Sequence, residues 1–336
     1  MKILIIGLGS MGKRRIRNLK ALNIAEIQGF DPRPDRRKEA EELYGIQTYP
    51  TFDEAVAHQF DAFVISVPPD IHHIYMKLAI EHGLPFFVEA SVVDDDMDLI
   101  IKGVEEKGIL AAPSSTMIFH PAIKKIMSFV KDGTLGKITN IIYHSGQYLP
   151  DWHVYESVKE FYVSNKATGG AREIVPFELT WLVKLLGFPT AVSGLYKKTI
   201  AIEGAEEIDD TYNALFDYGA FILNLTIDVV SRVATRKLLV NGAEGQLQWD
   251  WNDDFVTVYT PGSGSVKHHF SVIEAQEGYN KNITEQMYIE EMDTFIQSVN
   301  KKQPFVNDLR QDHKVLKLLY ALEESSDQSK TIEIKW

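Results

Sequence analysis

The chain has 336 residues, of which 45% are hydrophobic and 24% charged, so it has the size and composition of a globular protein of about two domains. A formal net charge of −12 argues against nucleic acid as a main partner, and the absence of cysteine excludes disulfides, thiolate zinc sites and cysteine nucleophiles. The chain starts directly with a strand-like run and has no apolar segment of ~18 residues, so a cytoplasmic protein without a membrane span is expected.

A glycine motif follows the first predicted strand. Residues 2–6 (KILII) form an apolar run of strand length, and residues 7–12 (GLGSMG) read G-x-G-x-x-G before a stretch with helical apolar spacing. Here Gly7 allows a tight turn, Gly9 lets the backbone approach a pyrophosphate, and Gly12 lets the helix pack closely on the strand. The motif, with Ser10 and Met11 at the helix start, therefore predicts a dinucleotide site at the helix N-terminus.

The residue at the end of the second predicted strand, residues 26–30, is Asp31. An acidic side chain at this position accepts hydrogen bonds from the adenosine ribose and repels a 2′-phosphate, which favours NAD(H). Arg33, Arg36 and Arg37 follow closely, and arginine pairs well with phosphate, so NADP(H) remains the less favoured alternative. Arg33 is included among the predicted cofactor contacts.

Strand and helix patterns alternate up to about residue 115. Strands are predicted over 61–66, 85–88 and 109–112, and helices over 70–82 and 94–107. This order predicts a doubly wound parallel sheet in a first domain of residues 1–118, with ligands bound at the C-terminal ends of its strands.

The pattern changes in a second predicted domain, residues 119–336. A helix over 121–132, a strand over 137–148 and an irregular aromatic segment over 150–168 precede Gly169-Gly170, which opens another helix. Strands are then predicted over 192–202, 210–218, 221–230, 237–240, 246–251 and 256–259, followed by helices over 283–300 and 310–323 and a strand over 331–335. Successive strands without helices predict an antiparallel sheet, and Asn241-Gly242 predicts a hairpin turn. Packing of the C-terminal helices against the first domain is compatible with this prediction.

Several motifs are together specific to one fold family. They are the glycine motif, residues 67–72 (VPPDIH), 119–121 (FHP), 133–138 (GTLGKI), and Gly169-Gly170 before a helix ending in LLG at 185–187. Through them the chain resembles the glucose–fructose oxidoreductase/inositol dehydrogenase/MocA (Gfo/Idh/MocA) family over nearly its whole length. The resemblance implies a Rossmann domain, an α+β domain with a large open antiparallel sheet, and a homodimer or homotetramer formed through the open sheet face. Family members mostly oxidise or reduce a carbinol on a sugar, cyclitol or nucleotide sugar with a nicotinamide cofactor.

The resemblance also assigns site residues. It places Val67, Pro68 and His72 near the cofactor, with capping or packing as an equal alternative for His72, and Glu89 and Ala90 beside the nicotinamide.

The usual catalytic residues of the family are altered. The family commonly has Glu-Lys-Pro after its fifth strand, with the lysine on the reacting hydroxyl, whereas residues 89–91 read Glu-Ala-Ser. The family Asp and His on the helix after the glycine pair align with Glu173 and Phe177, a further Asp with Thr180, and an arginine with Ile118. Since a positioned acid–base contributes ~10²–10⁴-fold in rate, losing it without replacement would leave a slow enzyme.

Replacement groups are predicted in the second domain. His153 titrates near neutral pH and is the favoured proton shuttle, assisted by Glu173 or Glu178; a surface or packing histidine is the alternative. The candidate substrate-binding residues, whose alternatives are loop packing and surface ion pairs, are Trp152, Tyr155, Lys159 and Arg172. No cluster has metal-ligand spacing, so no metal is expected.

The leading hypothesis is an NAD(H)-dependent oxidoreductase for a sugar, cyclitol or nucleotide-sugar carbinol with an atypical acid–base site. One alternative is an NAD-binding sensor or accessory protein without turnover. Another is a redox-neutral, NAD-assisted elimination or hydrolysis on a sugar.

Overall fold

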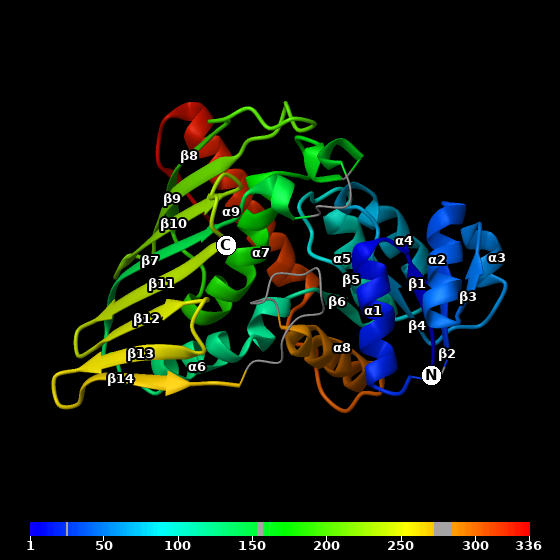
Figure 1. Ribbon diagram of the computed structural model, residues 1–336, viewed down its shortest axis with the longest axis horizontal. Helices are drawn as coiled ribbons and strands as arrows, with labels where there is room; N and C mark the ends of the chain where they lie inside the picture. Colours follow the sequence, from blue (N-terminus) through cyan, green and yellow to red (C-terminus); the bar gives the residue numbers. More distant parts are fainter. Residues whose placement is uncertain (25, 153–156, 161, 272–283) are drawn as a thin grey trace. The chain divides into compact units, whose positions relative to one another are not determined.

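The computed structural model describes residues 1–336 except 25, 153–156, 161 and 272–283. The chain folds into two compact units (Figure 1). The first unit comprises Met1–Thr116 and Gln286–His313, and the second comprises Met117–Glu285 and Lys314–Trp336. The first crossing between units thus lies close to residue 118, and residues 286–313 return to the first unit.

The first unit is built on a six-stranded parallel sheet in the order β3-β2-β1-β4-β5-β6. Its strands are β1 (Lys2–Ile6), β2 (Glu26–Phe30), β3 (Gln47–Tyr49), β4 (Ala62–Ile65), β5 (Phe86–Val88) and β6 (Ala111–Pro113). Its helices are α1 (Ser10–Ala21), α2 (Pro34–Tyr44), α3 (Phe52–Val56), α4 (His72–His82), α5 (Met97–Lys107) and, almost entirely, α8 (Glu285–Val299), with η1 (Pro69–Ile71) before α4. The central strands are apolar along their length because both faces of such a sheet are covered. The predicted doubly wound fold is confirmed.

Helix α8 supplies part of the core of the first unit. Met292, Phe295 and Ile296 are buried in the same cluster as Ile3 and Phe87 of the sheet. The rings of Phe87 and Phe295 meet edge to face with centroids 5.8 Å apart. The returning segment 286–313 is therefore an integral part of the Rossmann unit.

The second unit contains a nine-stranded sheet in the order β14-β13-β12-β11-β7-β10-β9-β8-β15. Its strands are β7 (Ile138–Gly146), β8 (Ala191–Lys197), β9 (Thr211–Asp217), β10 (Ile222–Asp228), β11 (Thr235–Gly242), β12 (Gln246–Asp250), β13 (Phe255–Thr260), β14 (Gly264–His269) and β15 (Ile332–Glu333). Its helices are α6 (Pro121–Lys131), α7 (Ala171–Leu186) and most of α9 (Leu309–Gln328), with short turns η2 (Thr116–Phe119), η3 (Leu149–Asp151), η4 (Val158–Glu160) and η5 (Tyr162–Ser164). The sheet is antiparallel, as predicted, except that β7 and β10 run parallel.

The predicted hairpin turn at Asn241-Gly242 is wrong by a few residues. Both residues still belong to β11, whose register shifts between them, and β12 begins only at Gln246. A Cβ on Gly242 would lie 2.0 Å from the carbonyl oxygen of Leu135. The glycine is thus required by a close backbone approach and not by the turn.

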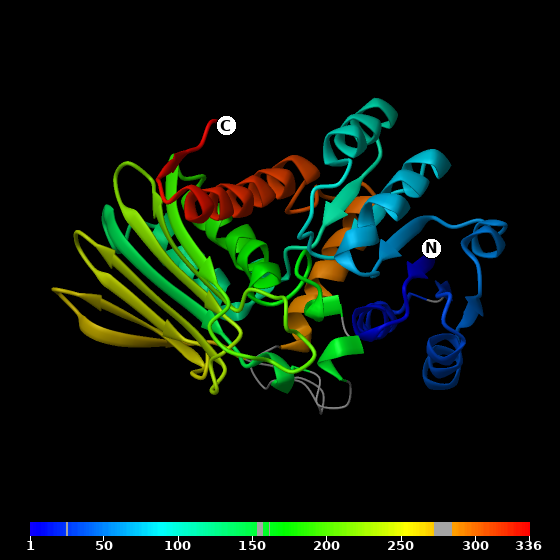
Figure 2. The ribbon, with the colours of Figure 1, turned by 90° about the horizontal axis from the view of Figure 1, so that it is seen from above.

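The two faces of the nine-stranded sheet differ. Figure 2 shows α7 and α9 along one face, and the other face carries no helix in the described part of the chain. Tyr143 and Phe216 point to the covered face and are buried, whereas their neighbours Ile142 and Leu215 point to the open face and are 43% and 48% exposed. The alternation therefore produces one closed and one partly apolar open face.

Candidate active site

The glycine loop of the first unit excludes side chains at two of its three glycines. Gly7 has φ +92°, and a Cβ there would lie 2.7 Å from the carbonyl oxygen of Ser66. A Cβ on Gly12 would lie 1.9 Å from the carbonyl oxygen of Gly7. Helix α1 begins at Ser10 and Met11 follows it, and its N-cap residue, Gly9, has no side chain with which to cap the helix. The loop therefore has the backbone shape, followed by a helix N-terminus, that a dinucleotide pyrophosphate requires.

Asp31 closes this loop against the end of β2. Its side chain is almost fully buried, with Oδ2 accepting the Leu8 N–H at 2.8 Å and Oδ1 accepting the Arg33 N–H at 2.9 Å. The Arg36 guanidinium lies 3.8 Å from Oδ2 and beside Gly9. The Arg33 side chain is turned to the surface, where it pairs with Asp35 at 2.6 Å. Of these two arginines, Arg36 is the one placed at the loop.

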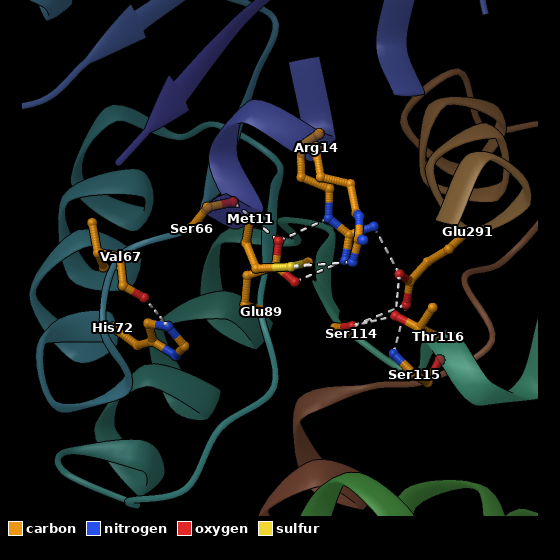
Figure 3. A network of polar contacts seen from close by, with 11 residues as sticks. Met11, Arg14, Ser66, Val67, His72, Glu89, Ser114, Ser115, Thr116 and Glu291 are labelled. Carbon is orange, nitrogen blue, oxygen red and sulfur yellow. Dashed lines mark hydrogen bonds and ion pairs between the residues drawn. The ribbon is translucent and has the colours of Figure 1, made fainter. Parts of the chain in front are cut away.

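A buried ion network lies behind the loop (Figure 3). Arg15, on the covered face of α1, is fully buried, and its Nε and Nη2 each lie 2.7 Å from an oxygen of Glu89 at the end of β5. Its Nη1 lies 2.9 Å from Glu291 of α8, which is also fully buried. Ser66, after β4, donates to the same Glu89 carboxylate at 3.0 Å. Burial lowers the pKa of Arg15, but the attraction of the two carboxylates raises it by more. The guanidinium therefore stays charged.

Glu291 in turn fixes the segment that follows β6. Its carboxylate accepts the Ser115 N–H at 2.6 Å and the hydroxyls of Ser114 and Thr116 at 3.1 and 2.7 Å (Figure 3). Burial raises the pKa of Glu291, against the lowering effect of Arg15. One arginine therefore joins α1, β5 and α8. Sequence reasoning missed Arg15, although a charged residue next to Ile16 on the apolar side of α1 is a signal for a buried ion pair.

The predicted residues after β4 and β5 are held by local contacts. His72 is buried, and its Nε2–H donates to the Val67 carbonyl at 2.9 Å. Burial lowers the pKa of His72 to about 4, so the imidazole is neutral at physiological pH. This bond fixes the turn containing Pro68. Glu89 is held by Arg15, and Ala90 follows it.

Glu173 lies in the first turn of α7 in the second unit. The Tyr162 hydroxyl of η5 donates a short hydrogen bond to its Oε1, while Oε2 is shielded from solvent and hydrogen-bonds to none of the described residues. Burial raises the pKa of Glu173 to about 7, and the bond from Tyr162 opposes this shift. A carboxyl group that titrates near neutral pH and keeps one uncommitted oxygen is suited to accept and return a proton.

The glycine pair before α7 brings these two residues together. A Cβ on Gly169 would lie 1.8 Å from the carbonyl oxygen of Val163, and Gly170 has φ +62°. The Gly170 N–H donates to the same Val163 carbonyl at 3.0 Å. Only glycine allows η5 to lie this close to the start of α7, and this packing places Tyr162 against Glu173.

Glu178 lies on the side of α7 that faces the sheet. It is fully buried and accepts hydrogen bonds from Tyr143 at 2.6 Å, Ser145 at 3.0 Å and Trp181 at 2.8 Å. Arg236 of β11 donates to it through Nε and Nη2 at 2.9 and 2.5 Å. Both oxygens are thus committed, which favours an anchoring role for Glu178.

The described members of the other predicted substrate contacts have different surroundings. Arg172 pairs with Glu323 of α9 at 2.7 Å, and Glu323 also accepts the Tyr212 hydroxyl at 3.0 Å. Trp152 donates to the Gln147 carbonyl at 3.3 Å. Lys159, on η4, lines a cavity of about 560 Å³.

Two of the predicted residues, His153 and Tyr155, lie outside the described residues. Within the described ranges, no three His, Asp or Glu side chains form a group able to hold a metal ion. None of the helices searched there is both long and apolar enough to cross a membrane.

Comparison with known proteins agrees with the geometry of the first unit. Residues 1–94 match the model of the Gfo/Idh/MocA oxidoreductase family, described as an NAD-binding Rossmann fold. The N-terminal domain belongs to this family. The predicted resemblance is thereby confirmed for the domain that carries the glycine loop. No curated protein matches the sequence.

Solved structures extend the likeness over both units. Levoglucosan dehydrogenase in complex with NADH superposes with a TM-score of 0.86 at 15% identity, covering 100% of this chain and 99% of that chain. An oxidoreductase from Agrobacterium radiobacter in complex with NAD⁺, L-tartaric acid and magnesium gives 0.86 at 14% identity, covering 99% and 98%. The GenD2 protein from gentamicin A biosynthesis, in complex with NAD, gives 0.82 at 18% identity, covering 100% and 97%. The two-unit fold of these solved structures is therefore present over the whole chain.

Replacing Arg15 tests the buried network. Arg15→Met leaves Glu89 and Glu291 without their cation, and we expect the free energy of unfolding to fall by about 3–5 kcal/mol in urea denaturation. Arg310→Met is the matched control, because Arg310 pairs with Glu105 on the exposed surface, and it should change stability little. Equal stability of the two variants would contradict a stabilising role for the Arg15 network.

Proposed function

We propose that the chain is an NAD(H)-dependent oxidoreductase that acts on a carbinol of a sugar, cyclitol or nucleotide sugar. The observation that carries the proposal is the glycine loop closed by Asp31 in a domain of the Gfo/Idh/MocA family. Structures of similar fold hold NAD or NADH, and one of them holds levoglucosan. In this role bound NAD(H) supplies the hydride acceptor or donor.

The cofactor-binding residues in this proposal form three groups. The glycine loop and α1 N-terminus (Gly7, Gly9, Ser10, Met11, Gly12) hold the pyrophosphate, and Asp31 and Arg33 lie on the adenosine side. The turns after β4 and β5 (Val67, Pro68, His72, Glu89, Ala90) lie on the nicotinamide side. The neutral His72 and the Arg15-bound Glu89 hold these turns in place without contributing a free cation.

Among the predicted acid–base residues that the structure describes, Glu173 is the one best suited to proton transfer. Tyr162 orients one of its oxygens, the other has no partner among the described residues, and its pKa lies near the pH at which it would work. His153 is proposed as its partner. Trp152, Tyr155 and Lys159 are proposed to contact the substrate, whereas Glu178 and Arg172 serve α7 as ion-pair anchors.

The direct test follows the nicotinamide absorbance of the purified protein with NAD⁺ or NADH and a panel of sugars, cyclitols, sugar acids and nucleotide sugars. Substrate-dependent formation or consumption of NADH supports the proposal. Confirmed NADH binding without any turnover would favour a sensor or accessory protein. Product formation without net NADH would favour a redox-neutral elimination or hydrolysis. The substitution of the family lysine and histidine by Ala90 and Phe177 is the feature that favours these alternatives.

The pH dependence tests Glu173. For alcohol oxidation the carboxylate form must accept the proton, so kcat/KM should rise with pH up to about 7 and then level off; for reduction it should fall over the same range. In Glu173→Gln this change of kcat/KM with pH, the limb of the profile, should disappear, and turnover should fall by about 10²–10⁴-fold. Glu324→Gln, on the surface of α9, is the control and should keep the profile.

Tyr162→Phe refines the same test. It removes the hydrogen bond that opposes the raised pKa of Glu173, so the limb should move to higher pH. A limb that stays in place in both Glu173→Gln and Tyr162→Phe would assign it to another group.

Cofactor preference tests the role of Asp31. We expect NADH to bind more tightly than NADPH in fluorescence titrations, because the Asp31 carboxylate repels a 2′-phosphate. Asp31→Asn should narrow the preference roughly tenfold, equivalent to about 1.4 kcal/mol. The control is Asp53→Asn, which removes an exposed carboxylate of α3 and should leave the preference as in the unmodified protein. Tighter binding of NADPH to the unmodified protein would reverse the assignment.

The open sheet face is proposed to form a homodimer or homotetramer interface. Leu215 and Ile142 lie on this face in register with Asn224 between them, and Leu195 on β8 is 57% exposed. Sedimentation should therefore give a dimer or tetramer. Leu215→Lys should shift it toward monomer, whereas Leu99→Lys, at an exposed site on α5, should not. A monomeric unmodified protein would contradict this assembly.

A further inference from the structure

The second unit contains a cavity of about 560 Å³ between two segments that are distant in sequence. One wall is formed by residues at η3 and by residues 157–159 at η4, and the other by the loop between β8 and β9. The cavity is lined mainly by Tyr148, Ser157, Lys159, Glu203, Gly204 and Glu206. Its volume lies within the range of about 300–1,000 Å³ that is typical of small-molecule sites, and exceeds the needs of a single hexose ring.

The same two segments meet at the start of α7, which carries Glu173. The Ser164 hydroxyl of η5 donates to the Lys159 carbonyl of η4 at 3.3 Å, so η4 is tied to the turn that holds the tyrosine partner of Glu173. On the other side, the Ala171 N–H of α7 donates to the Asp209 carbonyl at the end of the β8–β9 loop, at 3.1 Å. Both walls of the cavity are therefore anchored next to the proposed acid–base residue.

The two walls also touch each other directly. Gly204 has φ +82°, and a Cβ on it would lie 2.9 Å from the backbone nitrogen of Lys159. A side chain at this position would push the walls apart. The cavity is thus shaped by the local fold of the second unit.

The described charges at the cavity are two carboxylates against three cations, one of which, Arg232, lies on the ring of Tyr148. Glu203 and Glu206 face it together with Lys159, and Lys198 lies next to it, where its Nζ donates to the Ala205 carbonyl at 3.2 Å. The Gly204 N–H donates to Glu206 at 2.8 Å, and this bond together with the two lysines lowers the pKa of Glu206. A diphosphate is normally bound by a clear excess of cations and N–H donors, which this arrangement lacks.

One aromatic side chain contributes to the lining. Tyr148 lies on one wall, with the guanidinium of Arg232 3.7 Å from its ring centroid. An aromatic ring among alternating donors and acceptors suits the apolar faces and hydroxyl groups of a sugar.

We propose that this cavity binds the non-reacting part of a neutral glycoside or oligosaccharide whose other ring is oxidised or reduced. The inference rests on the proposed oxidoreductase function and narrows its substrate class to neutral saccharides larger than one ring, in preference to nucleotide sugars.

The test compares matched substrates. With NAD⁺, kcat/KM is measured for free sugars, for disaccharides that contain the same sugar, and for its nucleotide-diphosphate ester, while calorimetry measures disaccharide binding to the NADH complex. We expect the disaccharide to be favoured over the free sugar by at least about tenfold, and Tyr148→Ala to reduce this ratio roughly tenfold. Ser157→Trp, which fills the cavity from an exposed position, should reduce the ratio as well. Tyr259→Ala, at an exposed tyrosine of β13, should leave it as in the unmodified protein.

The outcomes separate the two proposals. Oxidation of free sugars with no preference for disaccharides, a ratio unaffected by both cavity variants, or a preference for the nucleotide ester would overturn the subsite and leave the oxidoreductase function standing. Disaccharide binding that depends on Tyr148 without any redox change would support the subsite and overturn the oxidoreductase function. Neither turnover nor disaccharide binding would overturn both.

Discussion

The buried guanidinium of Arg15 is the contact on which the geometry of the first unit depends. It brings together the helix after the glycine loop, the end of β5 and the returning helix α8 through two carboxylates that would be costly to bury alone. Glu291 extends the same network to the backbone and hydroxyls after β6. The strand ends at which a Rossmann fold binds its ligand are thus held by charge and not only by apolar packing.

The second unit anchors its main helix by the same kind of interaction. Glu178 on α7 is bound by Arg236 of β11 and by Tyr143 and Ser145 of β7, so the helix is fixed in rotation over the sheet. Arg172 fixes the start of the helix to α9 through Glu323. With both anchors in place, the first turn of α7 presents Glu173 in one defined position.

Local patterns predicted the parts of this structure that neighbouring residues determine. The glycine loop and Asp31 follow from a strand, a turn and a helix that are contiguous in the chain, and the family resemblance added the two-unit fold. The partners of charged residues could not be predicted in this way. Arg15 and Glu89 are 74 positions apart, and Glu178 and Arg236 are 58 apart, so only tertiary structure separates an anchoring carboxylate from a reactive one.

This distinction decides which carboxylate is available for proton transfer. Glu89 and Glu178 each accept two hydrogen bonds from an arginine and further bonds from hydroxyls, so a proton on either would compete with a buried cation. Glu173 has a neutral tyrosine as its partner and one oxygen without any among the described residues. A base needs an oxygen that is free to receive the proton. Its protonation must also break few stabilising ion pairs and hydrogen bonds. With Glu89 and Glu178 committed to arginines, Glu173 is the predicted acid–base residue, among those the structure describes, whose protonation disrupts no ion pair; outside the predicted set, burial also raises the pKa of Asp312 in the first unit to about 7.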